Sequence, residues 1–173
     1  MSPAAKAKFD ADISRINIVG EVSPNTTGIA QGQTVSSIFV LQVILKQKNF
    51  QQNTIAQISK LIDHNILLIL DCETDRKLAI YHSKLIQTEW GPAEAYAIEL
   101  KGLNLDSVWE NFVTQVGGIT IQQGNTLDEQ IAADEEQTKL EREITRLEKL
   151  AWTEKQPKKK FELVQQIQKL KGM

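Results

Sequence analysis

The sequence predicts an α+β protein, in which a mostly antiparallel sheet covered by helices is followed by a C-terminal helical hairpin or coiled-coil arm. Apolar runs and amphipathic stripes follow one another in the order helix, strand, helix, strand, strand, strand, helix. Residues 66–70 and 77–82 are joined by a short turn, as in an antiparallel hairpin. The chain then becomes charged and poor in aromatic residues. We therefore divide it into an α+β body, residues 1–124, and a charged helical arm, residues 125–173.

The first helix is predicted to begin at Ser2-Pro3, because Ser is a good N-cap and Pro is tolerated at the first helical position. Phe9, Ile13 and Ile16 follow at spacings of four and three, which is typical of one helical stripe. Residues 23–37 are rich in Gly, Ser, Thr, Asn and Gln, so they predict a loop.

Residues 35–46 are the clearest strand candidate. They carry apolar side chains at both odd and even positions, which predicts a central strand covered on both sides. The next helix is predicted to begin with a capping box over 54–57, and its apolar stripe contains Ile55, Ile58, Leu61 and Ile62.

In the rest of the body, the sequence predicts three more strands and a helix. Ile66–Leu70 is a buried strand, and residues 77–82 are its hairpin partner. Residues 96–100 alternate in polarity, as in a half-buried strand. A helix with its C-cap at Gly117-Gly118 follows. Its apolar stripe contains Leu105, Val108, Trp109, Phe112, Val113 and Val116.

The arm is predicted to be two helices. Thr126 to Glu129 form a capping box, and Pro157 interrupts the helical pattern. The two stripes contain Leu140, Ile144, Leu147 and Ala151 before the break, and Phe161, Val164, Ile167 and Leu170 after it. This pattern favours an antiparallel hairpin or a bent arm, through which the chain could also self-associate.

Composition excludes several classes of protein. The 173 residues are 41% hydrophobic and 24% charged, which is globular rather than disordered. Twenty basic and 22 acidic residues give a formal net charge of −2, so the net charge of the protein does not attract nucleic acid. The start of the chain has no signal-peptide pattern, and no apolar run approaches the roughly 20 residues of a membrane span. A single cysteine, Cys72, fits a reducing compartment. We expect a cytoplasmic protein without a membrane segment.

One pattern allows metal-dependent catalysis. An Asp on one strand and Glu-x-Lys on the next is the arrangement of a restriction-type nuclease, and Asp71, Glu99 and Lys101 match it. Such short matches arise easily at this composition. Asp71, Glu73 and Asp75 are interpreted as a solvated hairpin end rather than a metal site.

Other chemistry is poorly supported. Zinc would need four nitrogen or sulfur ligands, and the chain has only Cys72, His64 and His82. Cys72 and His82 could face each other across a hairpin as a nucleophile pair, but a buried Cys72 is the favoured interpretation. No phosphate-binding loop is present. We expect no metal and no cofactor.

A lysine cluster marks the predicted break in the arm. Residues 156–173 contain five Lys and one acid, Glu162, whereas the preceding helix is acidic. Lys155, Lys158, Lys159 and Lys160 lie together around Pro157. They either neutralise the acidic helix or bind phosphates or an acidic partner.

The sequence also resembles a known family. The similarity rests on Ile66–Leu70, Glu89-Trp90, the block LKGLNLDSVWENFVTQV (100–116) and the tail LEKLAWTEKQPKKKFELVQQIQKLK (147–171). These are similar to a bacterial family catalogued as a domain of unknown function. The resemblance implies an α+β body with a charged helical tail, encoded beside helicases and DNA methyltransferases in restriction-like defence loci. It names no catalytic residue.

Together these observations favour a non-enzymatic accessory or adaptor subunit of a nucleic-acid-processing, restriction-like phage-defence assembly. Its expected partner is a larger protein such as a helicase or methyltransferase. Two alternatives remain: a small metal-dependent nuclease built on Asp71, Glu99 and Lys101, and a free-standing nucleic-acid-binding protein that uses the lysine-rich arm.

Overall fold

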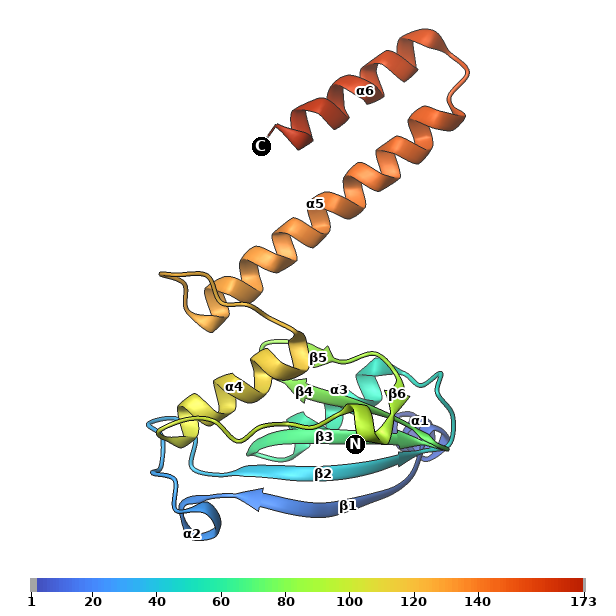
Figure 1. Ribbon diagram of the computed structural model, residues 1–173. Helices are drawn as coiled ribbons and strands as arrows, with labels where there is room; N and C mark the ends of the chain where they lie inside the picture. Colours follow the sequence, from blue (N-terminus) through green and yellow to red (C-terminus); the bar gives the residue numbers. More distant parts are fainter. Residues whose placement is uncertain (1–2, 173) are drawn as a thin grey trace. The chain divides into compact units, whose positions relative to one another are not determined.

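The computed structural model describes residues 3–172, so the predicted N-cap Ser2 lies outside the described residues. The chain forms two compact units, Met1–Thr120 and Ile121–Met173 (Figure 1). Each unit has its own arrangement of helices and strands.

The first unit is built on a mixed sheet, six-stranded in the part of the chain that the structure describes. The strands run in the order β1-β2-β3-β4-β5, and β6 also pairs with β4. Among the named strands of residues 3–172, β2 and β3 are parallel, with helix α3 crossing over between them, and the other pairs are antiparallel. The strands are β1 (Ile13–Val22), β2 (Ile38–Leu45), β3 (Asn65–Cys72), β4 (Asp75–Tyr81), β5 (Leu85–Gln87) and β6 (Gly91–Pro92). The predicted α+β class is confirmed.

The N-terminal segment differs from its prediction. Helix α1 (Pro3–Asp12) ends before Ile13, and Ile13 opens a ten-residue strand instead of continuing the helix. Tertiary contacts decide the outcome: β1 pairs with β2 over its whole length, and Asp12 is buried. The Asp12 carboxylate accepts hydrogen bonds from the Gln51 N–H (3.1 Å) and the Thr54 hydroxyl (3.2 Å), which fixes the end of α1 beside α3.

Helix α3 (Gln52–Leu61) begins two residues before the predicted capping box, so Thr54 lies in its first turn rather than at the N-cap. Its predicted stripe is correct at Ile55 and Ile58, which are buried, whereas Leu61 is exposed. The core under α3 contains Ile13, Leu41, Val43, Leu45, Ile55, Ile58, Ile66, Leu68, Leu70, Cys72 and Ala79.

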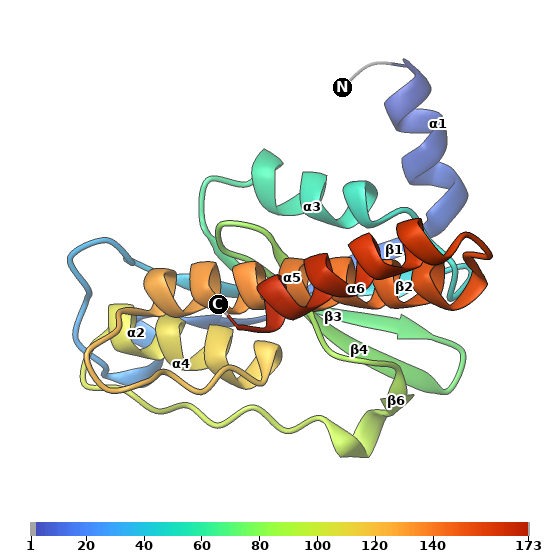
Figure 2. The same cartoon turned by 90° about the horizontal axis from the view of Figure 1, so that it is seen from above.

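The opposite face of the sheet lies toward α4 (Leu105–Gly117) (Figure 2). Side chains alternate along strands, so Leu67 and Ile80 point away from the α3 core, and both are buried. Helix α4 contacts β4 and β5 and buries its whole predicted stripe. Gly118 provides the C-cap in a left-handed conformation, φ 60°, as expected.

The predicted strand at 96–100 is wrong. A short 3₁₀ helix, η1 (Ala93–Ala95), follows β6, and residues 96–100 pair with no strand within residues 3–172. Instead, the backbone of Glu99 exchanges hydrogen bonds with the side chain of Gln115 on α4, at 2.9 and 2.8 Å.

Asp106, in the first turn of α4, fixes the long loop between α2 (Pro24–Thr27) and β2. Its carboxylate accepts hydrogen bonds from three successive backbone N–H groups, those of Gln33 (2.6 Å), Thr34 (3.1 Å) and Val35 (2.8 Å). These bonds, the one from Gln33 first, lower the pKa of Asp106. Gly32 allows the approach, because a Cβ there would lie 2.3 Å from an Asp106 oxygen.

The second unit is an antiparallel hairpin of α5 (Leu127–Thr153) and α6 (Pro157–Lys171), which confirms the predicted hairpin. The predicted capping box is present: Glu129 N–H donates to Thr126 Oγ1 (3.3 Å), and Thr126 N–H donates to Glu129 Oε2 (2.8 Å). The seam contains Ile144, Leu147, Ala151, Leu163, Ile167 and Leu170. No helix in residues 3–172 is long and apolar enough to cross a membrane.

Candidate functional site

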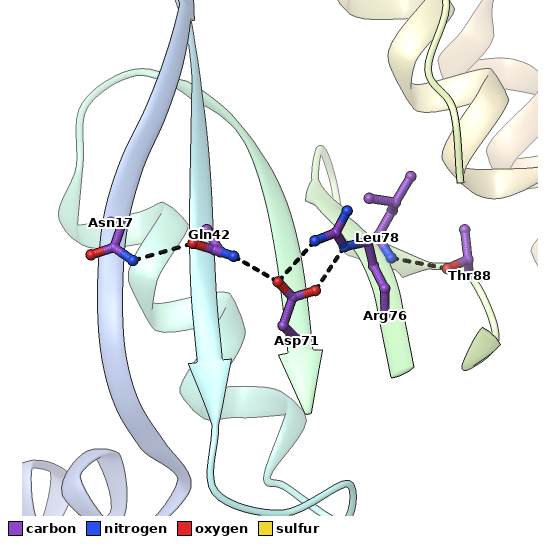
Figure 3. Close-up of polar contacts among 6 residues, drawn as sticks. All are labelled: Asn17, Gln42, Asp71, Arg76, Leu78 and Thr88. Atoms are coloured by element: carbon purple, nitrogen blue, oxygen red, sulfur yellow. Dashed lines mark hydrogen bonds and ion pairs between the residues drawn. The ribbon is translucent and has the colours of Figure 1, made fainter. Parts of the chain in front are cut away.

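Asp71, the first residue of the nuclease alternative, belongs to a polar row that crosses four neighbouring strands (Figure 3). Arg76 Nε donates to Asp71 Oδ1 (2.7 Å), and Arg76 Nη2 donates to Oδ2 (3.0 Å). Gln42 Nε2 donates to the same Oδ2 (2.7 Å), and Asn17 Nδ2 donates to Gln42 Oε1 (3.2 Å). The row therefore links β1, β2, β3 and β4 through side chains.

These contacts keep Asp71 ionised. The hydrogen bonds from Arg76, and then from Gln42, lower the pKa of the Asp71 carboxyl, while partial burial acts in the opposite direction. The same pair raises the pKa of Arg76. Both carboxylate oxygens are engaged by side chains, so the arrangement is that of a structural ion pair.

Glu99 and Lys101 do not join this row. Both are exposed, they lie outside the strands, and they form an ion pair with each other. Within residues 3–172, no three His, Cys, Asp or Glu side chains lie close enough together to hold a metal ion. The Asp and Glu-x-Lys residues thus share a sequence pattern with a nuclease core but not its two-strand arrangement.

Cys72 and His82 lie at opposite ends of the β3–β4 hairpin, so the idea that they face each other is wrong. Cys72 pairs with Asp75 beside the turn, whereas His82 follows the far end of β4. Burial raises the pKa of the Cys72 thiol, which suits a packed side chain. His82 Nδ1 accepts a hydrogen bond from the Trp109 indole N–H at 3.2 Å.

Strand β1 forms an outer edge of the sheet, and three apolar side chains are exposed along it. The exposed fractions are 37% for Ile16, 72% for Ile18 and 52% for Val19. Within the described residues, β1 pairs only with β2, so its other edge carries backbone groups without a strand partner. The register shifts between Ile18 and Gly20, which makes Val19 the extra residue of a bulge. An edge strand with this much exposed apolar surface is a candidate interface.

The end of the hairpin where α5 turns into α6 carries a second cluster, which we call the arm tip: Trp152, Lys155, Lys158, Lys159, Lys160 and Phe161. All six side chains are exposed, Trp152 at 85% and Phe161 at 62%. Among the described residues, none of the four lysines forms an ion pair, although Lys171 further along α6 pairs with Glu148 across the hairpin at 2.7 Å. The arm tip therefore combines free positive charge with exposed rings.

Comparison with family models gives one result. A model described as "Domain of unknown function (DUF4391)" matches residues 1–172. The chain belongs to this family. Neither the search of curated proteins nor the search of solved structures found a match. The exposed surfaces of this DUF4391 domain are therefore the guide to its function.

Sequence reasoning identified the lysines of the arm tip but missed its rings. It assigned Phe161 and Val164 to the seam, whereas the seam uses Leu163 and both are exposed. The alternative spacing Leu163, Ile167, Leu170, four and three apart, was visible in the sequence. The edge strand was missed because Ile13 and Ile16 fit a helical spacing, although Ile16 and Ile18 also alternate as in a strand.

Proposed function

We propose that this DUF4391 protein is a non-enzymatic accessory subunit that docks through its α+β body to a larger component of a nucleic-acid-processing, restriction-like defence assembly. The exposed outer edge of β1 carries the proposal. Within the described residues, the outer edge of this ten-residue strand has no strand partner, so an extended segment of another protein can add a strand to it. Ile16, Ile18 and Val19 supply apolar contacts beside those hydrogen bonds.

Natural sheets usually protect such edges with charges, prolines or a covering segment. In β1, two register shifts, at Ser14 and at Val19, and the exposed charge of Arg15 give partial protection, but Ile18 and Val19 remain exposed. At one end of the strand, the Thr26 hydroxyl donates to the Glu21 carbonyl at 2.9 Å, which occupies one backbone acceptor but leaves the apolar middle uncovered. This exposure is costly for a protein that remains alone, so it favours a permanent partner.

The resemblance supplies the kind of partner. The family pattern implies genes beside helicases and DNA methyltransferases, so we propose one of these enzymes as the partner of the β1 edge. The Asp71 row supports a scaffold role rather than catalysis, because both carboxylate oxygens already accept hydrogen bonds from Arg76 and Gln42.

Purification from the native host at endogenous level, followed by mass spectrometry, tests the proposal. The wild-type chain should retain a helicase or methyltransferase, and Ile18→Asp should lose it, because a carboxylate would be desolvated at the new strand pair. The matched control is Leu103→Asp, which changes a side chain that is 92% exposed outside β1. Both variants should melt like the wild type. Equal retention by Ile18→Asp, or no such enzyme with the wild type, contradicts the proposal.

A further inference from the structure

The arm tip exposes two aromatic rings that the hairpin does not use. Trp152 follows the seam residue Ala151, so it points about 100° away from the seam. Phe161 precedes the seam residue Ile167 by six positions, which also turns it away. Neither Trp152 nor Phe161 belongs to the seam, so polar residues at these two positions would leave the packing of α5 against α6 unchanged. Large rings with 85% and 62% of their surface in water therefore indicate a ligand with flat apolar faces.

Four exposed lysines lie close to these rings in the sequence, at the turn between α5 and α6. Lys158, Lys159 and Lys160 are consecutive at the start of α6, so their side chains point in three directions about 100° apart. Lys155 lies on the other side of Pro157. Two acidic residues, Glu154 and Glu162, are close to the lysines in sequence. Glu154 already accepts a hydrogen bond from the Gln156 N–H at 2.8 Å. The ligand should therefore carry negative charge at several points.

We propose that the arm tip binds single-stranded nucleic acid, with bases stacked on Trp152 and Phe161 and phosphates contacted by the four lysines. Alternating flat bases and phosphates match this mixture of rings and cations. In a duplex the base faces are covered by their neighbours, so exposed rings add nothing to binding. The inference rests on the proposed function, since it names the nucleic-acid contact of the same assembly, but it uses a different surface.

A lipid surface is the main competing ligand, because rings and lysines also occur in interfacial helices. Such helices need a continuous apolar face. In α6, the exposed positions after Phe161 are mostly polar or charged: Glu162, Gln165, Gln166, Gln168, Lys169 and Lys171. The apolar surface of α6 outside the seam is restricted to Phe161 and Val164, so single-stranded nucleic acid is favoured.

Two measurements on the full-length protein test this inference: fluorescence anisotropy with a labelled 20-nucleotide oligo-dT and a labelled duplex of equal length, and co-sedimentation with phosphatidylserine vesicles. We expect preferential binding to oligo-dT. Trp152→Ala and Phe161→Ala should each weaken it about tenfold, the usual order for one stacked base. Trp152→Phe should restore most of the affinity. Leu103→Ala, which changes an exposed aliphatic side chain outside the arm, should have little effect.

The lysines are tested through salt. For a single strand, each phosphate contact contributes about −0.7 to the slope of log affinity against log salt concentration. Changing Lys158, Lys159 and Lys160 to Gln should therefore make the slope shallower by about 2. Circular dichroism should show unchanged helicity, because all the altered side chains are exposed.

Two results overturn the inference: equal or stronger binding to duplex or vesicles, and oligo-dT affinity unaffected by loss of both rings. The result is independent of the β1 edge. Ile18→Asp should bind oligo-dT like the wild type, so loss of the protein partner and loss of the nucleic-acid contact are separate outcomes.

Discussion

Replacing Trp109 by Ala should strongly destabilise the body. Only 5% of Trp109 is exposed, and it lies on the buried stripe between α4 and the sheet. Emptying a buried aromatic site costs about 3–5 kcal/mol, through lost burial and the cavity left behind. The indole N–H adds a hydrogen bond to His82, 3.2 Å away, worth about 1 kcal/mol.

Two further variants separate the contribution of the hydrogen bond from that of the buried ring. Trp109→Phe keeps an aromatic ring but removes the donor, so it should cost about 1–2 kcal/mol. Trp152→Ala makes the same chemical change as Trp109→Ala at a site that is 85% exposed, so it should alter unfolding by less than about 0.5 kcal/mol.

Urea unfolding followed by circular dichroism provides the measurement, with equal slopes required for comparison of midpoints. If Trp109→Ala lowers the free energy of unfolding by less than about 1 kcal/mol, or by no more than Trp152→Ala does, Trp109 is not packed between α4 and the sheet. Phe112, 3% exposed on the same stripe, offers a second test at a site without a polar group.

Two other predictions concern polar contacts. Because Arg76 lowers the pKa of Asp71, the stabilisation is complete above the unfolded-state pKa and is lost as pH falls through the folded one. Asp71→Asn should therefore lose less unfolding free energy than the wild type between pH 5 and pH 3; equal losses in urea titrations would refute this. Gly32→Ala should destabilise the body by about 1–3 kcal/mol, because its Cβ would lie 2.3 Å from Asp106, and an unchanged melting temperature would contradict that crowding.

The body helices and the β3–β4 hairpin could be predicted because their signals are local. The stripes of α3 and α4 have the correct phase, and the capping box of α5 and the C-cap of α4 occupy the expected residues. Each depends on side chains within one or two turns of each other.

Non-local partners explain the errors. Ile13 fits both a helix and a strand, and its pairing with Leu45 decides between them. Residues 96–100 alternate as a strand should, but within residues 3–172 no strand pairs with them, and Gln115 satisfies Glu99 instead. The sequence pattern shows the periodicity of a segment, but it does not show which other segment will pair with it.

The candidate site shows the same division. Asp71 was identified from its type and position, but the hydrogen bond that it accepts from Gln42, 29 residues away, could not be predicted. The lysines of the arm tip were visible as a run of charge. Phe161 was placed in the seam because two apolar spacings overlap on α6, and packing against α5 selects Leu163.

The bonds from Asp106 to the loop before β2 also affect how the chain is made. Their donors lie 71 to 73 residues earlier, so β2 and its loop leave the ribosome long before the helix that fixes them. Until α4 emerges, backbone N–H groups of this loop have no carboxylate to bind. Protection of these amides from hydrogen exchange should therefore appear late in synthesis, and it would report completion of the whole body.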